Sequence, residues 1–161
     1  MKASSSAGIL LYRRRHDGLE VLLAHPGGPY WARQQHASWS VPKGIAEPDE
    51  APEAVAAREF AEETGFELAA VARDPARSPL DLGEVTLKSG KVIHAWAVEG
   101  DLDPELAHSN EFEIEWPPRS GRLQTIPEVD RVAWFGPDEA RSRAHPAQAV
   151  FVDRLEAALR S

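Results

Sequence analysis

The 161-residue sequence contains no cysteine, which excludes disulfides, thiolate metal sites and a cysteine nucleophile. It also lacks a long hydrophobic run. The apolar stretch at residues 7–12 is too short for a signal peptide or a membrane-spanning helix. Because nothing argues for an oxidising compartment or a membrane partner, we expect a cytoplasmic protein.

A basic surface is missing as well. The formal net charge is −8, and the only basic run is residues 13–15, which we interpret as a solvated strand end. Proteins that bind duplex nucleic acid usually carry a basic patch, so nucleic acid is not an expected partner. An acidic protein can still bind an anionic substrate when a divalent cation stands between the two negative charges.

The composition is that of a globular protein, with 42% hydrophobic and 27% charged residues, and the length suits one domain over residues 1–161. Apolar runs predict strands at residues 7–13, 19–25, 91–98 and 131–135. Helical patterns are found at residues 52–64, 137–143 and after Pro146. We therefore predict the α/β class, as a three-layer α/β/α sandwich with a mixed β-sheet. The segments 26–38 and 103–126 are predicted to be irregular.

The end of the first predicted helix is unusual because Glu59, Glu62 and Glu63 crowd one face of its last turns. Like charges at this spacing cost about 0.2–0.5 kcal/mol per pair. The negative end of the helix dipole adds about 0.3–1 kcal/mol per charge. Arg58 offsets only part of this cost. One interpretation is a solvated acidic face; the other is a site for a hard divalent cation, which prefers clustered carboxylates.

The spacing around this helix carries a resemblance. Gly44 is followed after five residues by Glu50 and after seven more by residues 58–66, with Phe60 and Phe66 at two apolar positions. This pattern resembles the Nudix box at every defined position, and a chance match is on the order of 10⁻⁹ per position. The resemblance implies the Nudix α/β/α sandwich and a Mg²⁺-dependent pyrophosphohydrolase, with Mn²⁺ as an alternative cofactor.

Roles for individual residues are also implied by the resemblance. It assigns the metal ligands to Gly44, through its carbonyl, and to Glu59, Glu62 and Glu63. Arg58 would orient a metal-binding glutamate. Glu50 is either part of the site or only a favourable anion at the helix start.

The general base is left open between two places. Inside the box, Glu62 is the first choice and Glu59 the second. Outside it, Glu128 resembles an extra acidic residue of several Nudix subfamilies, although a solvated loop acid is an equal interpretation.

Residues 40–44, 90–96 and 128–134 resemble the flanks of diadenosine polyphosphate hydrolases, which implies a polyphosphorylated nucleotide substrate. The candidate substrate-binding residues are Lys43, Lys91, His94 and Trp39. The alternatives are two ordinary surface lysines, a structural strand histidine like His25, and a core tryptophan. Tyr30 and Trp31 also lie close enough in sequence to stack on a base. Residues 112–122 have no counterpart in that group.

Three functions remain open: a hydrolase of nucleotide polyphosphates, a nucleotide-binding regulator without turnover, and a hydrolase that removes oxidised nucleotides. The intact box favours an enzyme. The sequence leaves a monomer and a homodimer equally open.

Overall fold

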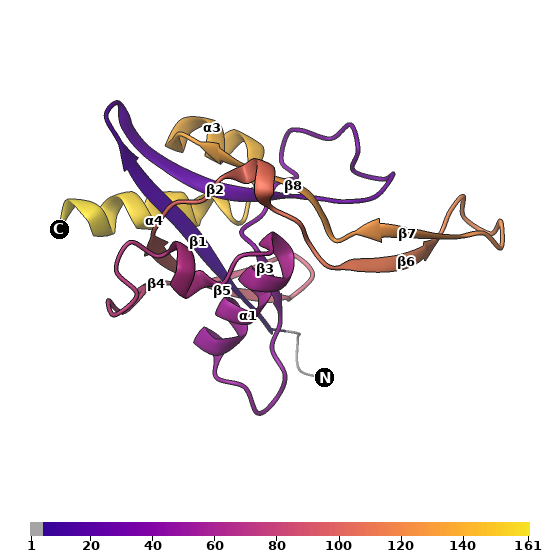
Figure 1. The fold of residues 1–161 in the computed structure, drawn as a ribbon, viewed down its shortest axis with the longest axis horizontal. Helices are drawn as coiled ribbons and strands as arrows, with labels where there is room; N and C mark the ends of the chain where they lie inside the picture. The colour runs from indigo at the N-terminus through magenta and orange to yellow at the C-terminus, as the bar shows by residue number, and fades with distance from the viewer. Residues whose placement is uncertain (1–4) are drawn as a thin grey trace.

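The computed structural model describes residues 5–161 and has a mixed central sheet with helices on both of its faces (Figure 1). The strands of the central sheet are β1 (Ser5–Arg15), β2 (Gly18–Pro26), β3 (Lys43–Ile45), β4 (Leu80–Thr86), β5 (Val92–Glu99) and β8 (Val129–Phe135). Their order is β4-β5-β1-β2-β8, and β3 pairs with the start of β1. The pairing of β1 with β5 is parallel, while the others are antiparallel, so the predicted mixed sheet is confirmed.

The helices form the two outer layers. They are α1 (Pro52–Thr64), α2 (Leu68–Val71), α3 (Pro137–Arg143) and α4 (Ala149–Arg160), with a 3-10 helix, η1, at Pro104–Leu106. One hydrophobic cluster joins α1 to the sheet through Val55, Ala56 and Phe60, and another joins α4 through Phe151 and Leu155. The α/β/α sandwich is therefore confirmed.

Strand β1 supplies apolar side chains to both layers. Successive side chains of a strand point to opposite faces. Ile9 and Leu11 accordingly pack in the cluster under α1, whereas Leu10 and Tyr12 pack in the cluster under α4. Since all four are at most 2% exposed, this strand is the centre of the fold.

Helix α1 begins and ends where its sequence predicts. Pro52 occupies the first turn, where a missing N–H costs nothing. Gly65 ends the helix in the left-handed conformation, with φ of 80°, and its N–H donates to the Ala61 carbonyl. These two signals fix the register that places the glutamates of the last turns.

The prediction of an irregular segment at residues 103–126 was wrong. The segment contains η1, strand β6 (Glu111–Glu115) and most of strand β7 (Leu123–Pro127), and the two strands form a hairpin outside the central sheet. Figure 1 shows this hairpin projecting sideways from the body of the molecule. Its side chains are mostly exposed, so burial imposes little pattern on its sequence. The short β3 and the edge strand β4 were also not predicted.

The arginines of residues 13–15 lie at the exposed end of β1, as predicted. Arg13 forms 2.8 Å ion pairs with Glu20 and with Asp101, and Arg15 lies 3.7 Å from Glu20. These ion pairs balance the positive charges of Arg13 and Arg15 with carboxylates of the protein itself. Across residues 5–161, no helix combines the length and apolar character needed to cross a membrane.

Candidate active site

Arg58 is shared by three carboxylates, two from α1 and one from Glu50 just before the helix. Its Nη1 donates to Glu59 and Glu62, each at 3.1 Å, and its Nη2 and Nε donate to Glu50 at 3.0 and 3.2 Å. The hydrogen bonds to Glu50 and then Glu62 raise the pKa of Arg58, and the same contact lowers the pKa of Glu50. One cation cannot neutralise three anions, so the cluster keeps a net negative charge.

Strand β3 brings Gly44 against the side chain of Glu59. Gly44 pairs with Ala7 of β1, and a Cβ atom on Gly44 would collide with the Glu59 carboxylate. Glu59 is 9% exposed, and its pKa is raised, first by burial and then by the charge of Glu62, against the effect of Arg58. The fold thus brings together Gly44 and Glu59, two of the predicted metal ligands.

Glu63 lies on the other side of the cluster, beside Lys43. The backbone N–H of Lys43 donates to Glu63 Oε1 at 3.3 Å. Burial raises the pKa of Glu63 to about 8, even though the charge and N–H of Lys43 act in the opposite direction. A carboxylate that is costly to ionise gains most from a cation placed beside it.

Glu128 and Glu63 border one pocket of 410 Å³. Its other lining residues are Ala24, Pro26, Ser38, Ser40, Lys43, Phe112 and Val129. The backbone of Glu128 is held at both ends, since its N–H donates to Asn110 and its carbonyl accepts from Gly27. The charge of Glu128 contributes to raising the pKa of both Glu59 and Glu63, so its carboxylate belongs to the same electrostatic site.

The carboxylate oxygens present are suitable ligands for a hard divalent cation. Glu59, Glu62 and Glu63 offer only oxygen atoms, which are the ligands of Mg²⁺ and Mn²⁺. No three acidic or imidazole side chains of residues 5–161 are already gathered around one point. Instead, Arg58 Nη1 contacts Glu59 and Glu62 together. Arg58 therefore holds the Glu59 and Glu62 carboxylates beside each other.

The structure places the predicted substrate-binding residues in different environments. Lys43 lines the 410 Å³ pocket. Lys91 is exposed in the turn between β4 and β5 and does not line that pocket. His94 Nε2 lies 2.6 Å from Asp81 Oδ1, and its ring stacks on Trp96 with 3.9 Å between centroids. His94 is thus already engaged by side chains of β4 and β5.

The assignment of Trp39 to substrate binding is corrected. Trp39 is 2% exposed and packs edge-on against His25 and Phe135, with centroid distances of 5.0 and 4.9 Å. A buried ring of this kind cannot stack on a nucleobase, so the core alternative holds. His25 is structural too, because its ring nitrogens lie 2.9 Å from Asp130 Oδ1 and 2.6 Å from the Gln34 carbonyl.

Phe112 is a pocket residue that the sequence analysis missed. It is 41% exposed and reaches the pocket from β6. The alternation of acidic and apolar residues over Glu111–Glu115 is a strand signal that could have revealed it. Farther out, Tyr30 contacts Trp116 of the hairpin, with 4.8 Å between ring centroids. The hairpin and the 27–38 segment therefore meet through aromatic residues beside the pocket.

The sequence matches a known family, and the fold resembles solved structures. The family model described as NUDIX domain matches residues 2–155. An Ap4A hydrolase of C. elegans, in a binary complex, superposes with a TM-score of 0.66 at 18% identity, covering 96% of this chain and 98% of that one. The NUDIX domain of Shewanella oneidensis NrtR, complexed with ADP ribose, gives a TM-score of 0.62 at 16% identity, covering 99% and 90%.

A MutT protein from Methanosarcina mazei gives a TM-score of 0.59 at 17% identity, covering 99% of this chain and 97% of that one. A sequence search of curated proteins finds no match. At these identities the structural likeness concerns the fold.

Proposed function

Because this chain belongs to the NUDIX domain family and so to a class of pyrophosphohydrolases, we propose that it is a Mg²⁺-dependent hydrolase of nucleotide polyphosphates. Its substrate class would be a nucleoside diphosphate linked to another group, with a dinucleoside polyphosphate as the first candidate. The observation that carries the proposal is the 410 Å³ pocket bordered by Glu63, Glu128 and Lys43 at the end of an acidic helix.

The metal ligands we propose are Glu59, Glu62, Glu63 and the Gly44 carbonyl. A bound cation would lower the pKa of a water ligand and neutralise phosphate oxygens. Arg58 acts as a positioning residue, since its bonds to Glu59 and Glu62 hold both carboxylates while Glu50 anchors the guanidinium. Gly44 leaves the space that Glu59 needs.

We assign the pocket residues to substrate binding. Lys43 supplies a positive charge for a phosphate group. Phe112 offers an exposed aromatic surface on which a nucleobase can stack. We propose Glu128 as the general base, in preference to Glu62, because Glu128 lines the pocket whereas Glu62 is bonded to Arg58.

A substrate panel tests this proposal. The purified chain is incubated with diadenosine tetraphosphate, ADP-ribose, nucleoside triphosphates and an oxidised nucleotide, each with Mg²⁺, Mn²⁺ or chelator, and the products are separated by chromatography. We expect cleavage that requires the metal and is fastest for the dinucleotide. Nucleotide binding without turnover under either metal would refute the enzyme and support the regulator.

Variants connect the activity to the site. Glu128→Gln is expected to slow turnover with little change in metal affinity, whereas Glu63→Gln is expected to weaken both. Glu53→Gln is the matched control, since Glu53 lies in the exposed first turn of the same helix. A Glu128→Gln enzyme with unchanged kcat would return the base to Glu62.

A further inference from the structure

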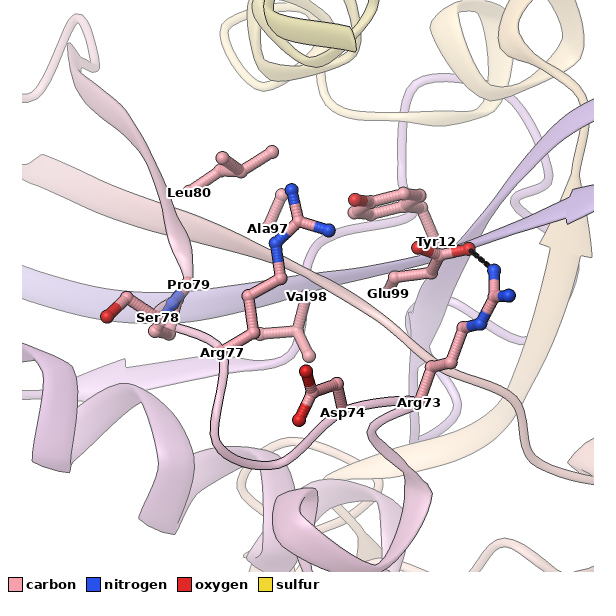
Figure 2. A pocket seen from close by; sticks show the side chains of 10 residues that line it. All are labelled: Tyr12, Arg73, Asp74, Arg77, Ser78, Pro79, Leu80, Ala97, Val98 and Glu99. Carbon is pink, nitrogen blue, oxygen red and sulfur yellow. Dashed lines mark hydrogen bonds and ion pairs between the residues drawn. The ribbon is translucent and has the colours of Figure 1, made fainter.

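A second pocket lies at the end of β1, remote from the acidic helix. We call it the edge pocket; it has a volume of 370 Å³, and its lining includes Tyr12, Arg73, Asp74, Arg77, Leu80 and Ala97 (Figure 2). This volume is within the range of pockets that hold small molecules, about 300–1,000 Å³. Its floor is the β1–β5–β4 part of the sheet, and its rim is the segment between α2 and β4.

The hydroxyl of Tyr12 is the first polar group of the edge pocket. Tyr12 is only 2% exposed, yet its hydroxyl forms no hydrogen bond with any of residues 5–161. Figure 2 shows this hydroxyl pointing into the space beside the Arg77 guanidinium. The ring of Tyr12 is buried, but its hydroxyl opens onto the pocket, because the buried side-chain polar atom without a partner among residues 5–161 is Trp39 Nε1. Here the pocket is where a partner would have to bind.

Arg77 is the second polar group. Its guanidinium reaches over Ala97 (Figure 2), and within residues 5–161 it forms neither an ion pair nor a side-chain hydrogen bond. The neighbouring Arg73 differs, because it is paired with Glu99 at 3.0 Å. Arg77 is therefore the cation of this pocket whose donors remain available.

The remaining charges restrict the ligand. Asp74 and Glu99 also line the edge pocket, and Arg73 balances only Glu99. One available guanidinium beside the Asp74 carboxylate suits a ligand with a single negative charge better than a phosphate dianion. Leu80, Ala97 and Val98 supply apolar surface for the rest of the ligand.

We propose that the edge pocket binds a small organic carboxylate with an apolar body. The guanidinium of Arg77 would pair with the carboxylate, and the Tyr12 hydroxyl would donate a hydrogen bond to it. The binding reaction needs no turnover at the acidic helix, so it stands apart from the proposed hydrolase activity.

The two pockets are separated along one strand. Ala7 of β1 pairs with Gly44 at the acidic helix, and Tyr12 lies five residues farther along. At about 3.3 Å per residue the two positions are roughly 17 Å apart. They also face opposite sides of the sheet, because Ala7 packs with α1 and Tyr12 with α4. A ligand in the edge pocket therefore does not occupy the substrate pocket.

Titration of the full ¹⁵N-labelled chain with sodium benzoate, followed by amide chemical shifts, tests the proposal. We expect saturable shifts centred on Arg77, Leu80 and Val98. Benzamide, which has the same shape without the charge, and inorganic phosphate at pH 8 should bind at least tenfold more weakly. Tyr12→Phe should raise the benzoate Kd about fivefold, the effect of one lost hydrogen bond. Arg77→Gln should raise it about tenfold or more.

Arg122→Gln is the matched control, because Arg122 is an exposed arginine on the hairpin outside the edge pocket, and we expect it to leave the benzoate Kd unchanged. The spectra of each variant also report whether it is folded, and Arg77 is exposed enough that its replacement should not disturb the core. Benzoate binding that survives Arg77→Gln, benzamide binding as tight as benzoate, or tighter binding of phosphate would overturn the proposal. So would shifts centred on Lys43, Glu63 and Phe112.

Discussion

Helices α1 and α4 cover opposite faces of one sheet but follow different rules at their C-terminal ends. Helix α4 has Arg160 in its last turn, where a cation favours the helix dipole. Helix α1 has no basic residue in its last turn, and Glu62 and Glu63 stand there instead. The packing faces of the two helices are equivalent, with Phe60 and Phe151 both fully buried.

This difference shows which side of α1 contributes to stability and which side contributes to the proposed function. The buried side of α1 contributes to the core as any amphipathic helix does, while its other side collects charges that a stable helix would avoid. Packing of Val55, Ala56 and Phe60 compensates for that electrostatic cost. Substitutions that make the two helices alike, or that make them differ more, test this division.

The largest effect is expected where the helices are alike. Phe60→Ala and Phe151→Ala should each lower the free energy of unfolding by about 3–5 kcal/mol, because each removes a fully buried ring. Urea denaturation measures both values. Val150→Ala is the control on α4, since Val150 is 37% exposed, and it should change the free energy by less than about 0.5 kcal/mol. Similar values for all three variants would contradict the assigned core.

The next effect concerns the glutamates near the end of α1, where α4 has a basic residue instead. Glu59→Gln and Glu63→Gln should lower kcat by about a hundredfold or more, because each removes a proposed metal ligand worth several kcal/mol in the transition state. The same variants should unfold at an equal or higher urea concentration, since a neutral amide avoids the cost of a crowded and buried carboxylate. Steady-state kinetics and denaturation on one preparation provide both numbers. A variant that loses stability and activity in proportion would indicate a structural role instead.

Arg58 and Arg160 provide a matched pair of arginines. Arg58→Gln should lower metal-dependent turnover by about tenfold to a hundredfold, because Glu59 and Glu62 lose the group that orients them. Arg160→Gln should change only the free energy of unfolding, by about 0.3–1 kcal/mol. Arg58→Lys should not rescue turnover, because an ammonium cannot reproduce the planar contacts to three carboxylates. Full activity of Arg58→Gln would remove Arg58 from the site.

The stability of the protein without metal is also expected to depend on pH. The pKa of Glu63 is raised from 4.5 to about 8 by burial, so the folded protein holds a proton that the unfolded chain releases. This contribution to stability is complete below pH 4.5 and is lost as the pH rises through 8. The raised pKa of Glu59 acts in the same direction. Urea unfolding in chelator at pH 5.5, 7 and 8.5 should show the decline, and Glu63→Gln should flatten it.

Much of this contrast could be predicted from the sequence, because it depends on local rules. Pro52, Gly65 and the spacing of Glu59 and Glu63 determine where α1 begins, where it ends and which face is acidic. The buried strands were predictable for the same reason, since β1 and β2 are almost continuously apolar. The family pattern implied that Gly44 and Glu59 both bind metal, and their close approach in the structure explains why position 44 has no side chain.

The remainder depends on contacts between distant parts of the chain. Trp39 is followed by the strand-like pair Ser40 and Val41, and nothing local reveals that it packs between His25 and Phe135. The β6–β7 hairpin has little buried surface, so the alternation over Glu111–Glu115 does not mark a face that packs on the core. The edge pocket joins Tyr12 to Arg77, which are 65 positions apart in the sequence, and only the sheet brings them together.

The hairpin of β6 and β7 has a consequence for how this protein can diverge. Its strands pair with each other in a sheet of their own, while Phe112 reaches the substrate pocket. Mutations there, including insertions that lengthen both strands together, can accumulate without shifting the register of the central sheet. Selection for a new substrate can therefore act on this segment while the helix that carries the glutamates stays constant, so the hairpin is the region to randomise in a directed-evolution library.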